Sequence, residues 1–287
     1  MAELFPVSPE RHGKRFWRRF PSYEFVHEHQ KVPIVLGEHE QTAATLPIVF
    51  MRTASGLSPV ALTRLGKKTA LVAPNGAWRG AYVPSILRVH PFHTKPTNDG
   101  KFVLLVNEAS GLITDDPADE PFFDTQGGLS ATVEDVLNFF KKRVTAELRT
   151  EQAMSEIVER DLLKPLRTHE SFAGLGESVM VPNTEKIATL MRNELYALHR
   201  VSALSLLYAS CIAQNHISFL AYAESAEARL EGSRSPSPQI NTESGATGTA
   251  DLSEFFEALA VSQDSNASLP DFADDVGPEH SKEQGGK

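Results

Sequence analysis

The spacing of hydrophobic and polar positions divides the chain into a strand-rich first part and a helical second part. Short apolar runs fill residues 20–110, and turn residues such as Asn98-Asp99-Gly100 separate them, which predicts strands. From residue 130 the apolar positions recur at helical spacing instead. They are Val133, Val136, Leu137, Phe140 and Val144, after a possible capping residue, Ser130. Strands followed by helices predict an α+β fold with a mostly antiparallel sheet.

The individual elements follow from apolar runs and turn residues. We expect strands at residues 23–27, 32–36, 46–52, 59–64, 69–73 and 101–106. Residues 59–64 and 69–73 are expected to form a hairpin. Because proline cannot donate to a ladder, Pro33 and Pro47 indicate edge strands or strand starts. We expect helical segments at residues 38–44, 131–149 with a continuation to 162, 184–199 and 201–229, and a loop or hairpin at 167–182.

The composition changes after residue 229, so we expect one α+β domain at residues 1–229, strand-rich over 20–110 and helical over 130–229. Residues 230–287 are rich in Ser, Gly, Pro and acidic side chains and are expected to be disordered. Within them, Asp251 and Glu254 resemble a capping box. Leu252, Phe255, Phe256 and Leu259 then follow at helical spacing. This pattern predicts a short docking helix at residues 251–260, and the alternative is a solvated tail whose periodicity arises by chance.

Charge is concentrated at the end of the chain. The net charge of the 287 residues is −9, and residues 231–287 hold 11 acidic and 3 basic side chains, which gives −8. The remainder is therefore close to neutral, which argues against a dedicated nucleic-acid-binding protein. The single cysteine, Cys211, forms no intramolecular disulfide and is expected to be a core residue. Without a signal-peptide pattern or a transmembrane-length apolar run, we expect a soluble, cytoplasmic protein without a transmembrane segment.

A basic and aromatic segment lies at residues 11–20. Its cations alternate with Phe16, Trp17 and Phe20. One interpretation is peripheral contact with a membrane surface or a nucleic acid, since cations bind phosphate and aromatic rings insert or stack. The interpretation that we favour is an edge segment whose rings pack inward while its cations stay in water.

Residues 69–92 form the densest local unit, which we call the central unit. Pro74-Asn75-Gly76 predicts a turn after a short strand, and Pro84 begins a short helix. Trp, Tyr and Arg are enriched at binding hot spots. The candidate binding surface is therefore Trp78, Arg79, Tyr82, Arg88 and Phe92. In the alternative interpretation the aromatic rings are packing residues, and Arg88 pairs with a carboxylate.

Several motifs, in order along residues 5–225, resemble those of the bacterial SapC family. In the central unit they are Gly76, Trp78, Tyr82, Val83, Pro84, Arg88, Pro91 and Phe92. Further matching pieces are Pro6-Val7-Ser8, Arg11-His12-Gly13, Val32-Pro33-Ile34, Leu46-Pro47-Ile48-Val49-Phe50, and Phe122-Phe123-Asp124 followed by Gly127. The resemblance implies a family without a settled activity, and its name implies an association with a bacterial surface layer.

The sequence contains no nucleophile elbow, phosphate-binding loop or dinucleotide fingerprint. The ten histidines match no metal-site spacing, so we expect no metal and no cofactor. We therefore expect a non-enzymatic binding or accessory protein with a protein partner, linked to surface-layer or envelope processes. The alternative is an enzyme or small-ligand-binding protein with a pocket near Trp78 and Tyr82. The family name adds the cell surface as an alternative location.

Overall fold

The computed structural model describes residues 3–53, 56–97, 101–166 and 179–233. These residues belong to one compact unit, Met1–Ser235. The predicted docking helix at 251–260, with Leu252, Phe255, Phe256 and Leu259, lies outside the described residues. The last described helix continues to Ser233, so helical structure passes the boundary expected at residue 229.

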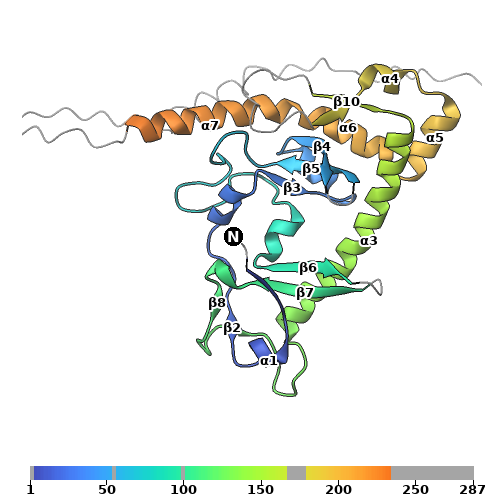
Figure 1. Cartoon of the computed structure of the whole chain (residues 1–287). Helices are drawn as coiled ribbons and strands as arrows, with labels where there is room; N and C mark the ends of the chain where they lie inside the picture. Colours follow the sequence, from blue (N-terminus) through green and yellow to red (C-terminus); the bar gives the residue numbers. More distant parts are fainter. Residues whose placement is uncertain (1–2, 54–55, 98–100, 167–178, 234–287) are drawn as a thin grey trace, which may run out of the picture. The chain divides into compact units, whose positions relative to one another are not determined.

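The largest sheet has five antiparallel strands in the order β10-β11-β4-β5-β3 (Figure 1). Their bounds are β3 Lys31–Pro33, β4 Ile48–Thr53, β5 Gly56–Leu62, β10 Leu163–Pro165 and β11 Met180–Pro182. Pro33 lies on an edge strand, and Pro47 immediately precedes β4, as the missing N–H of proline requires. Strand β10 pairs antiparallel with β11, and most of the loop or hairpin expected at 167–182, residues 167–178, lies outside the described part.

Two three-stranded sheets complete the strand-rich part, with strand orders β1-β7-β6 and β8-β2-β9. Their bounds are β1 Leu4–Pro6, β2 Phe16–Trp17, β6 Phe92–Pro96, β7 Phe102–Asn107, β8 Ile113–Thr114 and β9 Glu120–Pro121. All their pairings are antiparallel. Together with the helices that follow, these sheets confirm the predicted α+β class.

Short helices interrupt the strand-rich part, and longer ones follow it. The bounds are α1 Pro9–His12, α2 His39–Ala43, α3 Ala131–Glu159, α4 Thr184–Ala188, α5 Arg192–Arg200, α6 Ala203–Ala213 and α7 Asn215–Ser233. The 3-10 helices are η1 Glu24–Glu28, η2 Ser85–Val89 and η3 Glu108–Ser110. Within the described ranges no single helix is both long and apolar enough to cross a membrane. In the same ranges one pair, Arg192–Arg200 together with Ala203–Leu230, passes that test and is bent by 88°.

Helix α3 runs from the small sheets toward α5 (Figure 1). Its apolar stripe is long enough to enter two hydrophobic clusters. Ser130 caps the helix as predicted, since its Oγ accepts a hydrogen bond from Val133 N at 3.4 Å. The first turns of α3 bury Val133 and Phe140 against the small sheets. The last turns bury Met154 and Ile157 beside β4 and α6.

Helices α6 and α7 pack on the five-stranded sheet. Ala213, Ile217 and Leu220 are buried in one cluster with residues of β4 and β5. Two polar contacts add to this packing: Ser210 Oγ donates to Ile48 O at 2.8 Å, and Glu224 accepts from Leu65 N at 2.8 Å. One side of the α6–α7 helix is thereby attached to the sheet.

Two predicted strands are wrong. Residues 23–27 lie mostly in η1, Glu24–Glu28, rather than in a strand. Residues 69–73 contribute only the isolated bridge between Val72 and Trp78, and β5 pairs with β4 and β3 instead of forming the expected hairpin. The Thr69 hydroxyl donates to Thr63 O and accepts from Leu71 N. Such local side-chain bonds compete with a strand ladder.

The helix expected at 184–199 is broken into α4 and α5. Thr189 Oγ1 donates to Lys186 O at 2.9 Å, which closes the end of α4. Glu194 then accepts from Met191 N at 2.8 Å and satisfies a donor at the start of α5. Local capping therefore decides where one apolar segment divides into two helices.

Candidate functional site

The predicted turn at Pro74-Asn75-Gly76 is present in the central unit. Gly76 N donates to Ala73 O at 2.8 Å, and Asn75 Oδ1 accepts from Ala77 N at 3.1 Å. Gly76 has a φ of +80°, and a Cβ at this position would clash with Ser22 Oγ. Only glycine meets both conditions without strain, and the turn brings Trp78 back beside Val72.

The two aromatic residues of the central unit are linked to each other. Trp78 is partly buried, and its Nε1 donates to Tyr82 O at 3.0 Å. The Trp78 ring also lies 5.6 Å from the ring of Tyr23. Tyr82 is likewise partly buried, and its hydroxyl donates to Glu38 Oε2 at 2.9 Å. Hydrogen bonds therefore hold both amphipathic rings in fixed positions.

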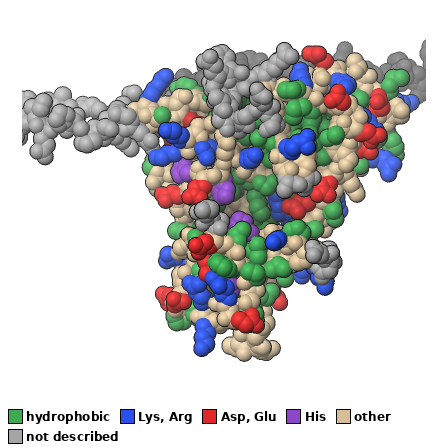
Figure 2. Space-filling model, viewed as in Figure 1, with side chains coloured by type: hydrophobic (Ala, Val, Ile, Leu, Met, Phe, Trp, Pro, Cys, Tyr) green, Lys and Arg blue, Asp and Glu red, His purple; other side chains and the backbone are tan. Residues whose placement is uncertain are grey.

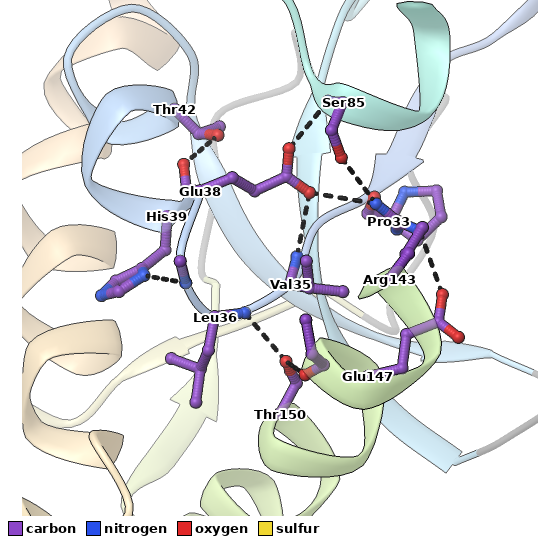
Figure 3. A network of polar contacts seen from close by, with 12 residues as sticks. Pro33, Val35, Leu36, Glu38, His39, Thr42, Ser85, Arg143, Glu147 and Thr150 are labelled. Atoms are coloured by element: carbon purple, nitrogen blue, oxygen red, sulfur yellow. Dashed lines mark hydrogen bonds and ion pairs between the residues drawn. The ribbon is translucent and has the colours of Figure 1, made fainter. Parts of the chain in front are cut away.

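Glu38, whose carboxylate accepts the Tyr82 hydrogen bond, is the centre of a buried polar network (Figure 3). Its Oε2 atom also accepts from Ser85 N at 2.7 Å. Its Oε1 atom accepts from Val35 N at 3.2 Å and from Arg143 Nη1 at 3.1 Å. Four donors from within the chain thus surround one carboxylate.

Arg143, which lies on α3, makes the remaining hydrogen bonds of this network. Besides Glu38, its guanidinium donates to Ser85 Oγ at 2.9 Å, Pro33 O at 2.9 Å and Glu147 Oε1 at 3.0 Å. Arg143 and Glu38 are each only 5% exposed. A buried ion pair is tolerated when further hydrogen bonds occupy its remaining atoms, and both partners meet that condition here.

Burial is the main cause of the altered acidity of Tyr82, and the negative charge of Glu38 adds to it. Together they raise the pKa of Tyr82 to about 12. The phenol is therefore protonated at neutral pH and donates its hydrogen to Glu38. It contributes a fixed hydrogen bond rather than a base.

The remaining predicted surface residues differ in exposure. Arg88 is exposed, its guanidinium lies 5.6 Å from the centre of the Tyr82 ring, and its Nη2 is 3.4 Å from Tyr82 Oη. Arg79 is exposed as well and donates to Ala70 O and to Glu227 of α7. Phe92 is 2% exposed and packs edge-on against Trp17.

The structure therefore brings Trp78, Tyr82 and Arg88 together, whereas Phe92 belongs to the hydrophobic core. The contact of Arg88 is with Tyr82 rather than with the carboxylate that the packing interpretation expected. The role of these residues as a binding surface stays a prediction.

Histidine side chains lie close to one another in the middle of the face seen in Figure 2. His90 stacks on Phe25 with ring centres 4.1 Å apart and an 8° angle between the rings. Burial, with additional repulsion from His93 and His29, lowers the pKa of His90 to about 4. Burial also lowers the pKa values of His29 and His93. No three His, Cys, Asp or Glu side chains in the described ranges are arranged to hold a metal ion.

The basic segment at residues 11–20 turns its rings inward. Trp17 is 4% exposed, and Phe20 packs against Tyr23 with ring centres 5.0 Å apart. Arg11 and Arg15 form ion pairs with Glu108. This geometry matches the edge-segment interpretation, and peripheral membrane contact through the cations stays a prediction.

Sequence reasoning missed the Glu38–Arg143 pair because 105 positions separate its members. One signal was present, however. Arg143 falls three residues after Phe140 and seven before Thr150, on the side of α3 that is buried. A cation within an otherwise apolar helical stripe indicates a buried partner, although it does not identify that partner.

No curated protein and no solved structure matches the chain. The sequence model of the SapC family matches residues 7–220, a range that contains the central unit together with Glu38 and Arg143. Because that match covers most of the 287 residues, the chain belongs to the SapC family.

Proposed function

We propose that the protein is a non-enzymatic accessory protein that binds a protein partner through Trp78, Tyr82 and Arg88. The supporting observation is that both aromatic rings are fixed by hydrogen bonds while the neighbouring guanidinium is exposed. Pre-organised side chains lose little entropy on binding, and Trp, Tyr and Arg are the usual anchors of protein interfaces. The exposed cation favours a partner with an acidic patch.

The alternative, an enzyme or small-ligand-binding protein with its pocket near Trp78 and Tyr82, has less support. A catalytic carboxylate needs an oxygen available to substrate. Both oxygens of Glu38 accept hydrogen bonds from within the chain, and the high pKa of Tyr82 keeps its phenol protonated. These groups are suited to supporting a surface rather than to moving a proton.

We also propose a cellular process and a location for this function. Family membership supports a role linked to surface-layer or envelope processes, through the name of the family alone. We propose a cytoplasmic location, with association at the cell surface as the alternative.

Photo-crosslinking in cells tests the proposed surface. A photoreactive amino acid at Ala81, which is exposed between Trp78 and Tyr82, is expected to capture a specific protein. Arg88→Glu reverses the exposed charge without removing any hydrogen bond to Glu38, so it should abolish that capture. Mass spectrometry of the cross-linked species identifies the partner and shows whether it is an envelope protein.

The matched control is Arg149→Glu, which reverses an exposed charge on α3 and should leave the capture unchanged. If the chain with the photoreactive residue at position 81 captures the partner equally well with and without Arg88→Glu, this surface is not the binding site. Capture of cytoplasmic proteins alone would contradict the envelope link while leaving the binding role intact.

A further inference from the structure

The α6–α7 helix, which runs from Ala203 to Leu230 with one turn residue between its two parts, carries large apolar side chains on its outer side. Tyr208 is 54% exposed, Ile212 63%, Phe219 61% and Tyr222 61%. Soluble proteins rarely expose several such side chains together unless the surface binds something. The opposite side of the same helix is buried on the sheet through Ser210, Ala213 and Ile217.

The outer residues follow a heptad pattern. Together with Asn215 and Ala226, the four apolar residues occupy positions 208, 212, 215, 219, 222 and 226, which are separated alternately by four and three residues. We call this row the outer stripe. Alternating steps of four and three are the spacing with which one helix packs along another. The geometry therefore favours a partner helix over a small ligand.

The chemistry of the outer stripe restricts the identity of that helix. Residues 203–223 contain no Asp, Glu, Lys or Arg. A helix that lies on a membrane surface usually carries Lys or Arg beside its apolar face. The predicted tail helix would bring Asp251, Glu254 and Glu257 to a helix whose only exposed cation in this region, Arg229, lies beyond the end of the stripe. A second copy of this chain brings an uncharged stripe of equal length.

We propose that the outer stripe pairs with the same stripe of a second copy, with the two helices antiparallel. Three aromatic rings that are more than half exposed, with Ile212, offer on the order of 500 Å² per copy. Two copies would bury about 1,000 Å², which is close to the smallest area of a specific interface. Antiparallel pairing also separates the two acidic tails, each with a net charge of −8 over residues 231–287 (11 acidic, 3 basic).

The midpoint of the outer stripe gives the pairing a register. It lies between Asn215 and Phe219, so a two-fold axis there places the exposed Ser218 close to its counterpart. A polar residue such as Asn215 within an apolar stripe commonly fixes the register of paired helices. Tyr208, near one end, is then far from the partner's Tyr208.

Sedimentation velocity of the full-length chain tests the pairing. We expect a species of twice 31.5 kDa at micromolar concentrations. The double substitution Ile212→Glu and Phe219→Glu should raise the dissociation constant about 100-fold or more, because central interface residues carry most of the binding energy. Leu148→Glu, at a 56% exposed position of α3, is the matched control and should leave the dimer intact.

Disulfide trapping tests the antiparallel arrangement and does not depend on how the charged variants fold. On a Cys211→Ser background, Ser218→Cys should cross-link two copies and Tyr208→Cys should not. A monomeric wild-type chain, or a dimer that survives the double substitution, overturns the proposal. The reverse cross-linking pattern overturns the antiparallel arrangement.

Two other occupants of the outer stripe give distinct results. The chain's own tail could cover the outer stripe and keep the wild-type chain monomeric. If the double substitution Phe255→Ser and Phe256→Ser then makes the chain dimeric, the tail is the occupant and the proposal is wrong. Binding of the monomer to phospholipid vesicles, lost in the Ile212 and Phe219 variant, overturns it as well. Loss of the dimer leaves photo-crosslinking through Ala81 unaffected, so this inference and the proposed function can fail separately.

Discussion

Arg143 shows how strongly one residue can constrain this fold. Its guanidinium joins Pro33, Glu38, Ser85 and α3 in a site that is only 5% exposed. The pair need not be more stabilising than an apolar substitute, because taking two charges out of water costs free energy. Removing one member of the pair destabilises the fold, because the charge of the other member then stays buried without a partner.

We therefore expect Arg143→Ala to lower the free energy of unfolding by about 3–5 kcal/mol. The nearby Arg149→Ala, at an exposed position of the same helix, should change it by less than about 0.5 kcal/mol. Urea unfolding followed by circular dichroism measures both. If the two substitutions cost the same, the network of Figure 3 does not stabilise the fold in the way described.

At the scale of elements, the central unit depends on contacts between a turn and its surroundings. The chain from Val72 to Trp78 forms one isolated bridge rather than a strand pair. Trp78 packs against two hydrophobic clusters, and its indole nitrogen fixes the backbone at Tyr82. Side-chain contacts therefore hold the central unit in place more than hydrogen bonds between strands do.

Trp78→Ala should accordingly lower the free energy of unfolding by about 3 kcal/mol, through lost burial and the cavity left behind. Trp78→Phe retains a ring but loses the donor to Tyr82 O, and about 1 kcal/mol is expected for that loss. Thermal melts of both variants, with the exposed Ala77→Ser as control, provide the comparison. An unchanged midpoint for Trp78→Ala would contradict the packing role.

For the molecule as a whole, the partly buried His90 couples the fold to pH. Burial lowers the pKa of His90 from 6.5 to about 4, with His93 and His29 adding to the shift. The unfolded chain consequently binds a proton at His90 between these two values while the folded chain does not. By proton linkage, the stability that this group contributes is complete above pH 6.5 and decreases as the pH falls toward 4.

We expect the free energy of unfolding to fall by up to about 3 kcal/mol from this group between pH 6.5 and 4. His90→Phe, which retains a ring to stack on Phe25, should reduce that loss. The pKa values of His29 and His93 are lowered too, so part of the loss should persist. Urea unfolding at several pH values measures it, and identical profiles for wild type and His90→Phe would contradict the account.

Much of the architecture follows from local patterns. The α+β order, the strand at residues 101–106, the capped start of α3 and the turn at Pro74-Asn75-Gly76 were all predicted from spacing and residue type. These features depend on neighbours in sequence, such as the donor of Val133 that Ser130 accepts or the positive φ at Gly76. The motif order also identified the family, which the match over residues 7–220 confirms.

Tertiary structure alone decided which residues meet across the chain. It buried Phe92, joined Glu38 to Arg143 and placed Arg88 over Tyr82. It also replaced an expected hairpin with pairing of β5 to β4 and β3. Sequence periodicity shows that a side chain belongs to a face but not what covers that face. For α6 and α7 only the packed structure shows that the buried side lies on the sheet and that the apolar outer stripe is exposed.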